Sequence, residues 1–507
     1  MTISFNAIPA NINVPVFYAE MDNSAANTAQ EGGKSLLIGY TLPDAPLEPH
    51  RLTLMPTAAQ AQKEAGQGSQ LARMVAAYRS VDPFGELWVI ALKPSDAGVA
   101  KGGVLLAGSP TAAGNLNVYI GRSRVQIAVA AAEPMASIAQ SLADKINALA
   151  DLPVTAKVDD PAEDDDGSQR QLTLTAKYGG TLGNGIPLTL NYYGSGSGEI
   201  LPAGLNVTLT AFTGGAGDAD LSPVVAAMGD EPFDFIGSPF SDASALRVLS
   251  MEMNDDSGRW SYARQIYGHV YTAKVGSLSE LVAFGDGFND QHLTIAGYEN
   301  TVQTPVEELV ALRLARDAVF IRNDPARPTQ TGELNGALPA PAGRRFTLTE
   351  QQTLLDHGIA TATAEGNRLM IQRDVTTYKV NAYGVKDNSY FDSETLHTSA
   401  YVLRRLRSVI TSKYGRHKLA NDGTRFGPGQ AIVTPSVIRG ELCAVYRAME
   451  RDGIVESFET FKKYLIVERN AANPNRLDVL FPPDYVNQLR VFALLNQFRL
   501  QYTEEEA

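Results

Sequence analysis

The amino-acid sequence predicts an α/β protein with a doubly wound central domain, an inserted β-rich domain and an α+β C-terminal domain. Three observations support this fold class. Residues 220–320 alternate apolar strands with helices, an order that produces a mostly parallel sheet. Residues 96–215 are rich in glycine, alanine, serine and threonine, and short strands recur there at regular spacing. Residues 346–507 then provide a further unit with two long helices.

The first 22 residues predict an N-terminal arm and not a domain. Ile3–Phe5 and Val14–Tyr18 are short extended segments. Pro9 and Pro15 exclude a regular helix across them. Residues 1–22 are therefore expected to be extended.

Residues 23–95 are predicted to form the first part of the central domain, in the order strand, helix, strand. A helix is expected over residues 58–78, although Gly66 and Gly68 weaken its middle. The segment Leu87–Leu92 is entirely apolar, which indicates a strand covered on both faces.

Residues 96–215 are predicted to be a separate β-rich domain inserted into the first and projecting outward. One helix, over residues 135–149, interrupts its short strands. The acidic loop at residues 159–166 lacks the calcium ligands of an EF-hand, because Ala162 and Thr173 stand where carboxylates are needed. We interpret it as a solvated loop.

Residues 216–345 are predicted to complete the central domain. Strands are expected at Phe233, His269 and His292, each followed by a helix. Ser277 and Glu280 have the spacing of a capping box. Before the third helix, Thr304 is expected to cap, with proline at the first helical position.

Residues 346–486 are predicted to form the C-terminal domain, and residues 487–507 a C-terminal arm. Thr347 and Glu350 form a second capping-box pattern, and long helices are expected over residues 392–414 and 435–451. The segment 489–500 is strand-like.

Composition and motifs argue against several functions. The formal net charge of −13 makes nucleic acid a poor partner for the whole surface. No stretch approaches the ~20 apolar residues that span a bilayer, so direct membrane insertion is not expected. A single cysteine, Cys443, fits folding in a reducing cytoplasm.

The sequence offers no catalytic, cofactor-binding or metal-binding motif. The strand ending at Gly237 is not followed by a dinucleotide-binding loop, and there is no nucleophile elbow. None of the six histidines has the spacing of a helical zinc pair. We therefore expect no enzyme activity, no cofactor and no metal.

Many segments, taken in order, resemble the tail sheath protein of Mu-like contractile phages. No single motif carries the resemblance, which covers most of the chain and is weakest over residues 96–215. The segments are Ile3–Asn6, Ile8–Pro9, Val14–Pro15, Tyr18–Glu20, Phe233–Phe240, Arg345–Gln352, Gly358–Ala360, Arg373–Tyr378, Asp392–Leu396 and Phe481–Val491.

This resemblance implies a subtilisin-like central fold and a structural subunit that polymerises as a helical stack of rings around a tail tube. Contraction of the sheath would drive the tube through the host envelope. The implied partners are further copies of the chain, the tail tube protein, and baseplate and tail terminator proteins. The implied location is the virion tail, assembled in the cytoplasm of the bacterial host.

Both termini are expected to supply strands to neighbouring subunits, because unpaired strands are templates for pairing with another chain. The alternative is that each arm completes the sheet of its own subunit. The candidate arm residues are Ile3, Phe5, Val14, Val16, Phe17, Leu489, Val491, Phe492, Leu494 and Phe498.

Positive charge is concentrated toward the C-terminus. Residues 376–507 carry 18 Lys/Arg and 15 Asp/Glu, a net of +3, which leaves −16 for residues 1–375. On the helix 392–414, an apolar stripe of Leu396, Leu403, Leu406 and Ile410 is expected to face the core. The cations beside it are candidate contacts to the tail tube, with a solvated helix face as the alternative: Arg404, Arg405, Arg407 and Lys413.

Two other functions are compatible with the sequence. One is the sheath of a phage-derived bacteriocin or bacterial injection system, which uses the same assembly in another setting. The other is a cytoplasmic α/β enzyme with an inserted β-domain, which would have a defined pocket and purify as a small oligomer.

Overall fold

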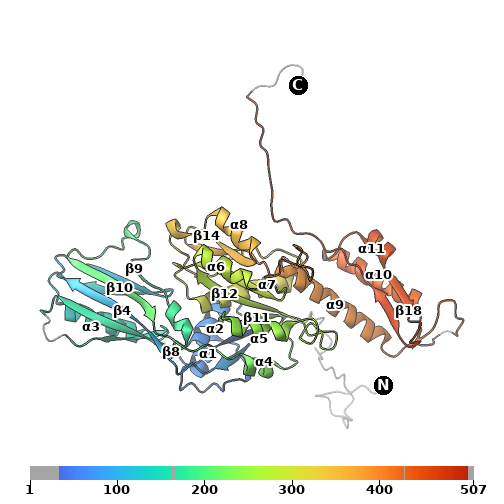
Figure 1. The fold of residues 1–507 in the computed structure, drawn as a ribbon, viewed down its shortest axis with the longest axis horizontal. Helices are drawn as coiled ribbons and strands as arrows, with labels where there is room; N and C mark the ends of the chain where they lie inside the picture. Colours follow the sequence, from blue (N-terminus) through green and yellow to red (C-terminus); the bar gives the residue numbers. More distant parts are fainter. Residues whose placement is uncertain (1–32, 162–165, 428, 501–507) are drawn as a thin grey trace, which may run out of the picture.

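The computed structural model describes residues 33–161, 166–427 and 429–500 and shows an elongated subunit (Figure 1). A β-rich body lies at one end, a large mixed sheet with helices lies in the middle, and a smaller helical body lies at the other end. The last described residues run away from these bodies as an extended chain. The candidate residues of the N-terminal arm, Ile3, Phe5, Val14, Val16 and Phe17, lie outside the described residues.

The middle body is built on an eight-stranded sheet in the order β15-β14-β13-β12-β11-β1-β3-β2. The six strands from β14 to β3 pair in parallel, and β15 and β2 add antiparallel edges. In chain order the strands are β1 (Ser35–Tyr40), β2 (Leu52–Leu54), β3 (Leu87–Leu92), β11 (Phe235–Gly237), β12 (His269–Gly276), β13 (Leu293–Glu299), β14 (Ile359–Glu365) and β15 (Arg368–Arg373).

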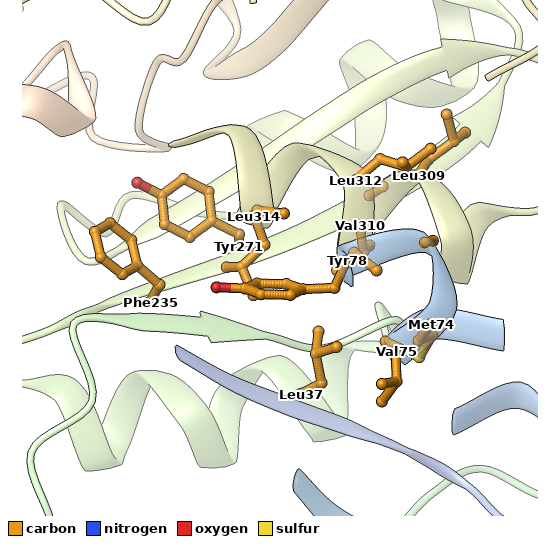
Figure 2. Packing of buried hydrophobic residues seen from close by; sticks show 14 of the residues in the cluster. Leu37, Met74, Val75, Tyr78, Phe235, Tyr271, Leu309, Val310, Leu312 and Leu314 are labelled. Carbon is orange, nitrogen blue, oxygen red and sulfur yellow. The ribbon is translucent and has the colours of Figure 1, made fainter. Parts of the chain in front are cut away.

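Helices cover both faces of this sheet, because its central strands are apolar on both sides. In β1, Leu37 packs with one set of helices, and Leu36 and Ile38 pack with the other. Figure 2 shows the first cluster, in which side chains of β1, β11, α2 and α7 surround Tyr78. That face carries α1 (Ala58–Ala65), α2 (Gln70–Val81) and α7 (Val306–Asn323); the other carries α4 (Ser222–Met228), α5 (Ala243–Met253), α6 (Leu278–Asp286) and α8 (Leu348–Asp356).

The helix expected over residues 58–78 is two helices. The chain breaks between α1 and α2 at Gly66 and Gly68, which have φ angles of +90° and +82°. A side chain at Gly66 would lie 2.7 Å from Leu42. Glycine is therefore required at Gly66, both by its left-handed backbone and by this close approach.

Both predicted capping boxes are confirmed. Ser277 and Glu280 cap α6 reciprocally, and Thr347 and Glu350 cap α8 in the same way. The predicted cap at Thr304 is wrong, because Pro305 occupies the N-cap position of α7 without a side-chain hydrogen bond. The Thr304 hydroxyl instead donates to the backbone carbonyl of Leu338.

The sheet continues beyond residue 345, where the sequence analysis placed the end of the central domain. Strand β14 pairs in parallel with β13, and β15 then pairs antiparallel with β14. The sequence analysis assigned residues 346–486 to the C-terminal domain, and local sequence patterns could not show that β14 and β15 join the central sheet.

The described strands between Val99 and Thr213 pair with one another in two sheets, in the orders β10-β4-β8-β7 and β6-β5-β9. With α3 (Met135–Ala148) they enclose a separate hydrophobic cluster. The strands are β4 (Val99–Gly108), β5 (Gly114–Ile120), β6 (Ser123–Val129), β7 (Val154–Val158), β8 (Gln169–Gly179), β9 (Leu188–Leu190) and β10 (Leu205–Thr213).

Buried ion pairs join this β-rich body to the sheet body. Arg73 of α2 donates to Glu307 at 2.5 Å and to Glu308 at 2.6 Å, both at the start of α7. From the β-rich body, the Tyr178 hydroxyl donates to Glu307 at 3.1 Å, and Arg122 pairs with Glu308. The two bodies therefore share one buried charge cluster.

The third body begins with the long helix α9 (Ser393–Tyr414). Its first half is buried against the sheet body, and its second half packs against α10 (Pro435–Arg451) and α11 (Phe458–Tyr464). The small sheets β16 (Lys418–Leu419) with β17 (Ile432–Val433), and β18 (Ile466–Arg469) with β19 (Leu477–Leu480), complete it. Within the described ranges, no helix is long and apolar enough to cross a membrane.

Candidate assembly surfaces

The described part of the predicted C-terminal arm, residues 487–500, leaves the third body as an extended segment. From residue 486 to residue 500 the described chain has no helix and no strand. Its apolar side chains are 71–97% exposed, and they are Leu489, Val491, Phe492, Leu494, Leu495, Phe498 and Leu500. Such a row of exposed apolar residues is typical of a surface that another chain covers.

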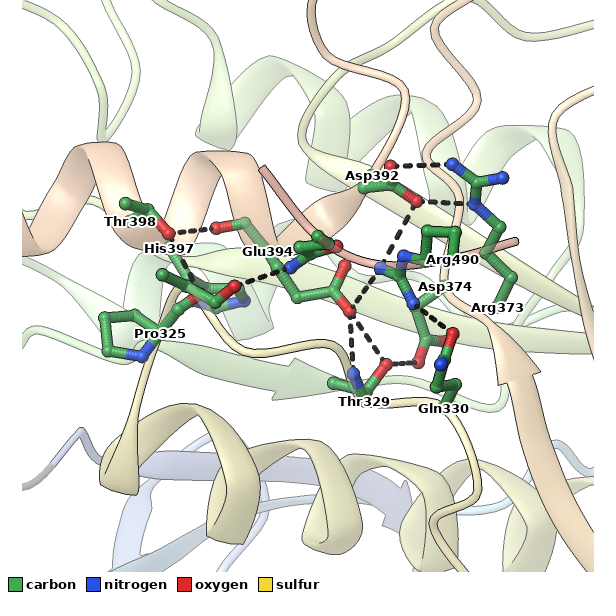
Figure 3. A network of polar contacts seen from close by, with 12 residues as sticks. Pro325, Thr329, Gln330, Arg373, Asp374, Asp392, Glu394, His397, Thr398 and Arg490 are labelled. Atoms are coloured by element: carbon green, nitrogen blue, oxygen red, sulfur yellow. Dashed lines mark hydrogen bonds and ion pairs between the residues drawn. The ribbon is translucent and has the colours of Figure 1, made fainter. Parts of the chain in front are cut away.

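The arm is attached to the sheet body at its root, residues 488–490. The Gln488 amide donates to the backbone carbonyl of Ala326 at 2.9 Å. The guanidinium of Arg490, only 10% exposed, donates to Glu394 at 2.9 Å and lies 3.5 Å from Asp392. The arm therefore touches the loop after α7 and the start of α9 before it extends into solvent (Figure 3).

Glu394 lies in the first turn of α9 and is completely buried. Its Oε1 accepts hydrogen bonds from the backbone N–H of Thr329 at 3.0 Å and from Arg490. Burial raises the pKa of the Glu394 carboxyl, and the positive charge of Arg490 opposes that rise. Arg490 is thus the cation that favours the ionised form of this buried acid.

Polar contacts continue from Glu394 into the large sheet. The Thr329 hydroxyl lies 2.9 Å from Glu394 and 2.7 Å from Asp374, and its single proton serves one of them at a time. Asp374 accepts from Arg313 of α7 at 2.6 Å, and Arg313 also donates to the carbonyl of Thr361 in β14 at 3.0 Å. A continuous chain of contacts therefore joins the arm root to the sheet.

Three of the four candidate tube-facing cations are paired within the subunit. Arg404 pairs with Asp234 and lies over the ring of Tyr267. Arg405 donates to Asp452 at 2.7 Å, and Lys413 lies 2.5 Å from Glu441. These contacts reach residues distant in the sequence, which the charge count along the helix did not reveal.

Arg407 is the fourth cation. Its side chain is exposed, and across the described ranges no ion pair of it is recorded. The expected apolar stripe is wrong at Leu403, which is 43% exposed, whereas Val402 is buried. Helix α9 changes its packing partner along its length, so one straight stripe does not describe it.

The hairpin-like pair β18–β19 offers open sheet edges. Its strands pair only with each other among the described residues, in the register Ile466 to Leu480. Exposed apolar side chains, among them Ile466, Val479 and Leu480, lie on it. A two-stranded sheet is marginally stable alone and gains from additional strands.

Two histidines are buried between α9 and the sheet. The Nε2 of His397 lies 2.9 Å from the Tyr271 hydroxyl, and its ring stacks on Phe235. The ring of His269 lies 5.7 Å away, between centroids. Burial, aided by the charge of Arg404, lowers the pKa of His397 to about 3. Burial also lowers the pKa of His269 well below its ordinary value.

A depression of about 810 Å³ lies beside α5 and α6. In it, His292 pairs with Asp255 at 3.0 Å and stacks on Trp260. Ser250 donates to Asp290 and not to His292. The serine–histidine hydrogen bond of a nucleophilic triad is therefore not formed at this depression. Over the described ranges, no group of three or more His, Cys, Asp or Glu residues could hold a metal ion.

The arm root was missed by sequence reasoning. Arg490 interrupts an apolar segment, Leu489 to Phe492, and that interruption was the available signal. Its partner Glu394 lies 96 positions away, so no local pattern links them.

Comparisons with known proteins agree with one another. Residues 214–377 match the phage tail sheath protein central domain, and residues 385–499 match the phage tail sheath C-terminal domain. The chain is similar to the Mu-like prophage FluMu tail sheath protein of Haemophilus influenzae, at 36% identity over 99% of this chain and 100% of that one.

Similar solved structures were also found. A sheath tail protein from Desulfitobacterium hafniense matches with 11% identity, TM-score 0.48, 94% of this chain and 97% of that one. A sheath tail protein from Listeria innocua matches with 13% identity, TM-score 0.48, and coverages of 90% and 93%. A chain of the anti-feeding prophage baseplate matches with 10% identity, TM-score 0.47, and coverages of 96% and 100%.

Proposed function

Because the chain belongs to the family of Mu-like phage tail sheath proteins, we propose that it polymerises as a helical stack of rings around a tail tube. Contraction of this stack drives the tube through the host envelope. The observation that carries the proposal is the arm with seven exposed apolar side chains. A row of apolar side chains in water is typical of a surface that another chain covers. The doubly wound, subtilisin-like arrangement of the sheet body is part of the same proposal.

We further propose that the arms pair with sheets of neighbouring subunits, and that β18–β19 is an acceptor. Its two outer edges are unpaired among the described residues, and its exposed apolar residues match the character of the arm. Head-to-tail contacts that do not close generate helical assemblies. Each backbone hydrogen bond contributes only about 0.5–1.5 kcal/mol net, so several must act together.

Truncation tests this pairing. Removing residues 491–507, or residues 1–18, is expected to leave a folded subunit that forms no tubes in negative-stain micrographs. Removing only residues 501–507 is the matched control, because the exposed apolar side chains remain, and this variant is expected to assemble. Normal tubes from both of the longer truncations would refute the role of the arms.

The proposed partners are further copies of the chain, the tail tube protein, and baseplate and tail terminator proteins. The proposed place of assembly is the cytoplasm of the host bacterium, and the virion tail is the final location. The prophage relative supports a phage tail over a bacteriocin or injection system as the setting.

For the tube contact, Arg407 is the candidate that is both exposed and without a recorded ion pair among the described residues, since the exposed Lys413 pairs with Glu441. Replacing Arg404 or Arg405 by glutamate would place a carboxylate against Asp234 or Asp452 and disturb the fold. Arg407→Glu is therefore the cleaner test. We expect it to weaken co-assembly with purified tubes in a salt-dependent way, whereas Lys145→Glu, at an exposed lysine of α3, should not. Equal, salt-independent co-assembly of both variants would contradict the contact.

A further inference from the structure

The root of the C-terminal arm lies on a site built for a guanidinium group. We call this site the arm seat, and it consists of Gln330, Asp392 and Glu394. Arg490 donates to Glu394 at 2.9 Å, lies 3.5 Å from Asp392, and donates to Gln330 at 3.4 Å. Figure 3 shows these side chains converging on Arg490 from the loop after α7 and the start of α9.

The arm seat lies at the junction of the two bodies, where the first turn of α9 is buried against the sheet body, and not in the part of the third body from which the arm comes. Residues 484–486 still contact the third body, where the N–H of Val486 donates to the carbonyl of Ile454 at 3.2 Å. The chain then crosses to the sheet body, where Gln488 donates to the carbonyl of Ala326. Residues 484–490 are thus a strap between the two bodies. It forms a second connection between them, in addition to the covalent connection through α9.

Charge makes Arg490 the decisive group in this strap. Glu394 is completely buried, and leaving a buried carboxylate without its cation is strongly unfavourable. Arg373 pairs with Asp392 and Arg313 with Asp374, so these nearby arginines already have acidic partners. Arg490 is therefore the cation that matches Glu394.

We propose that the ion pair between Arg490 and Glu394 is a latch that fixes the root of the C-terminal arm to the sheet body. The segment available to a neighbour then begins at Val491. Tension on the arm is then transmitted through the contacts of Glu394, Thr329 and Asp374 to the central sheet. It does not have to pass through the helices α10 and α11 of the third body. This mechanical consequence rests on the proposed pairing of arms, whereas the latch itself does not.

Proteolysis of the full-length chain tests the latch. Trypsin cleaves after arginine only when the side chain can enter the protease, so Arg490 is expected to resist cleavage while it is in the arm seat. Glu394→Gln removes the buried charge, and we expect the rate of cleavage after Arg490, followed by intact mass, to rise at least tenfold. Chymotrypsin cleavage after the exposed Phe492 and Phe498 should change less than twofold. Glu365→Gln, an exposed matched control at the end of β14, should behave as the unaltered chain.

A double variant guards against a general loss of folding. Arg490→Met leaves the buried Glu394 carboxylate without its cation, so this variant should lower the midpoint temperature of thermal unfolding. Combined with Glu394→Gln it should recover more than half of that shift, because no buried charge is left unpaired. The latch is overturned if Arg490 of Glu394→Gln stays resistant, if the unaltered chain is cut there as fast as at Phe492, or if the double variant shows no recovery. Tube formation is scored separately: a chain that is latched but forms no tubes refutes only the proposed function.

Discussion

Acid is expected to destabilise the sheet body through His397. Burial and Arg404 lower the pKa of His397 to about 3, from an ordinary value of about 6.5. Between these pH values the unfolded chain binds a proton that the folded chain does not. The contribution to stability is therefore complete above pH 6.5 and is lost as the pH falls.

The expected magnitude follows from this difference. At pH 5 the histidine is almost fully protonated in the unfolded chain and neutral in the folded chain. At 1.36 kcal/mol per pKa unit, this difference lowers the free energy of unfolding by about 2 kcal/mol relative to neutral pH. His269, also buried with a lowered pKa, adds a loss of the same sign.

Urea unfolding at pH 7.5 and pH 5 measures this loss. Both tryptophans, Trp88 and Trp260, lie in the sheet body, so their fluorescence reports its unfolding. In His397→Gln, the side-chain amide can still bond the Tyr271 hydroxyl but does not titrate. We expect this variant to lose about 2 kcal/mol less than the unaltered chain between the two pH values. His417→Gln, at an exposed histidine, is the control.

Groups that titrate in both proteins cancel from this comparison, including the buried carboxyls near Asp374. The result that would refute the reasoning is a parallel pH dependence, with the free energies of unfolding of the two proteins differing by the same amount at both pH values. Such a result would mean that His397 is protonated, or hydrated, in the folded state.

Three other predictions follow from the fold. Replacing residues 99–213 with a short linker should spare tube formation but lower the thermal midpoint, because Glu307 loses a buried partner; failure of the remaining chain to fold would contradict an outward, separable insert. Gly66→Ala should lower the free energy of unfolding by about 1–2 kcal/mol in urea titrations. Gly440→Ala within α10, where an added Cβ meets no neighbour, should raise it by about 0.5–1 kcal/mol. Equal effects of the two variants would contradict the requirement for glycine at the positive φ of Gly66. Arg313→Met should cost about 3–5 kcal/mol, because it leaves buried Asp374 without its cation. A loss below 1 kcal/mol would contradict a stabilising role for this ion pair.

The sequence by itself determined part of the local structure, and it identified the family. Residues three positions apart meet on any helix, so the capping boxes at Ser277 and Thr347 were readable and are confirmed. The long helix expected over residues 435–451 is likewise found there as α10. The order of many such segments identified a tail sheath protein of the Mu-like type, which the comparisons confirm.

Only the tertiary structure decided which distant groups meet. In the folded chain Arg404 pairs with Asp234, 170 positions away. The sequence analysis had treated Arg404 as a candidate contact to the tail tube, and this pairing argues against that role. Folding also added β14 and β15 to the sheet body and brought Arg490 to Glu394. Periodicity and capping report contacts along one element, because those depend on backbone geometry alone. Pairing between elements depends on how complete surfaces pack, and the burial that makes the Glu394 charge need Arg490 exists only once the chain has folded.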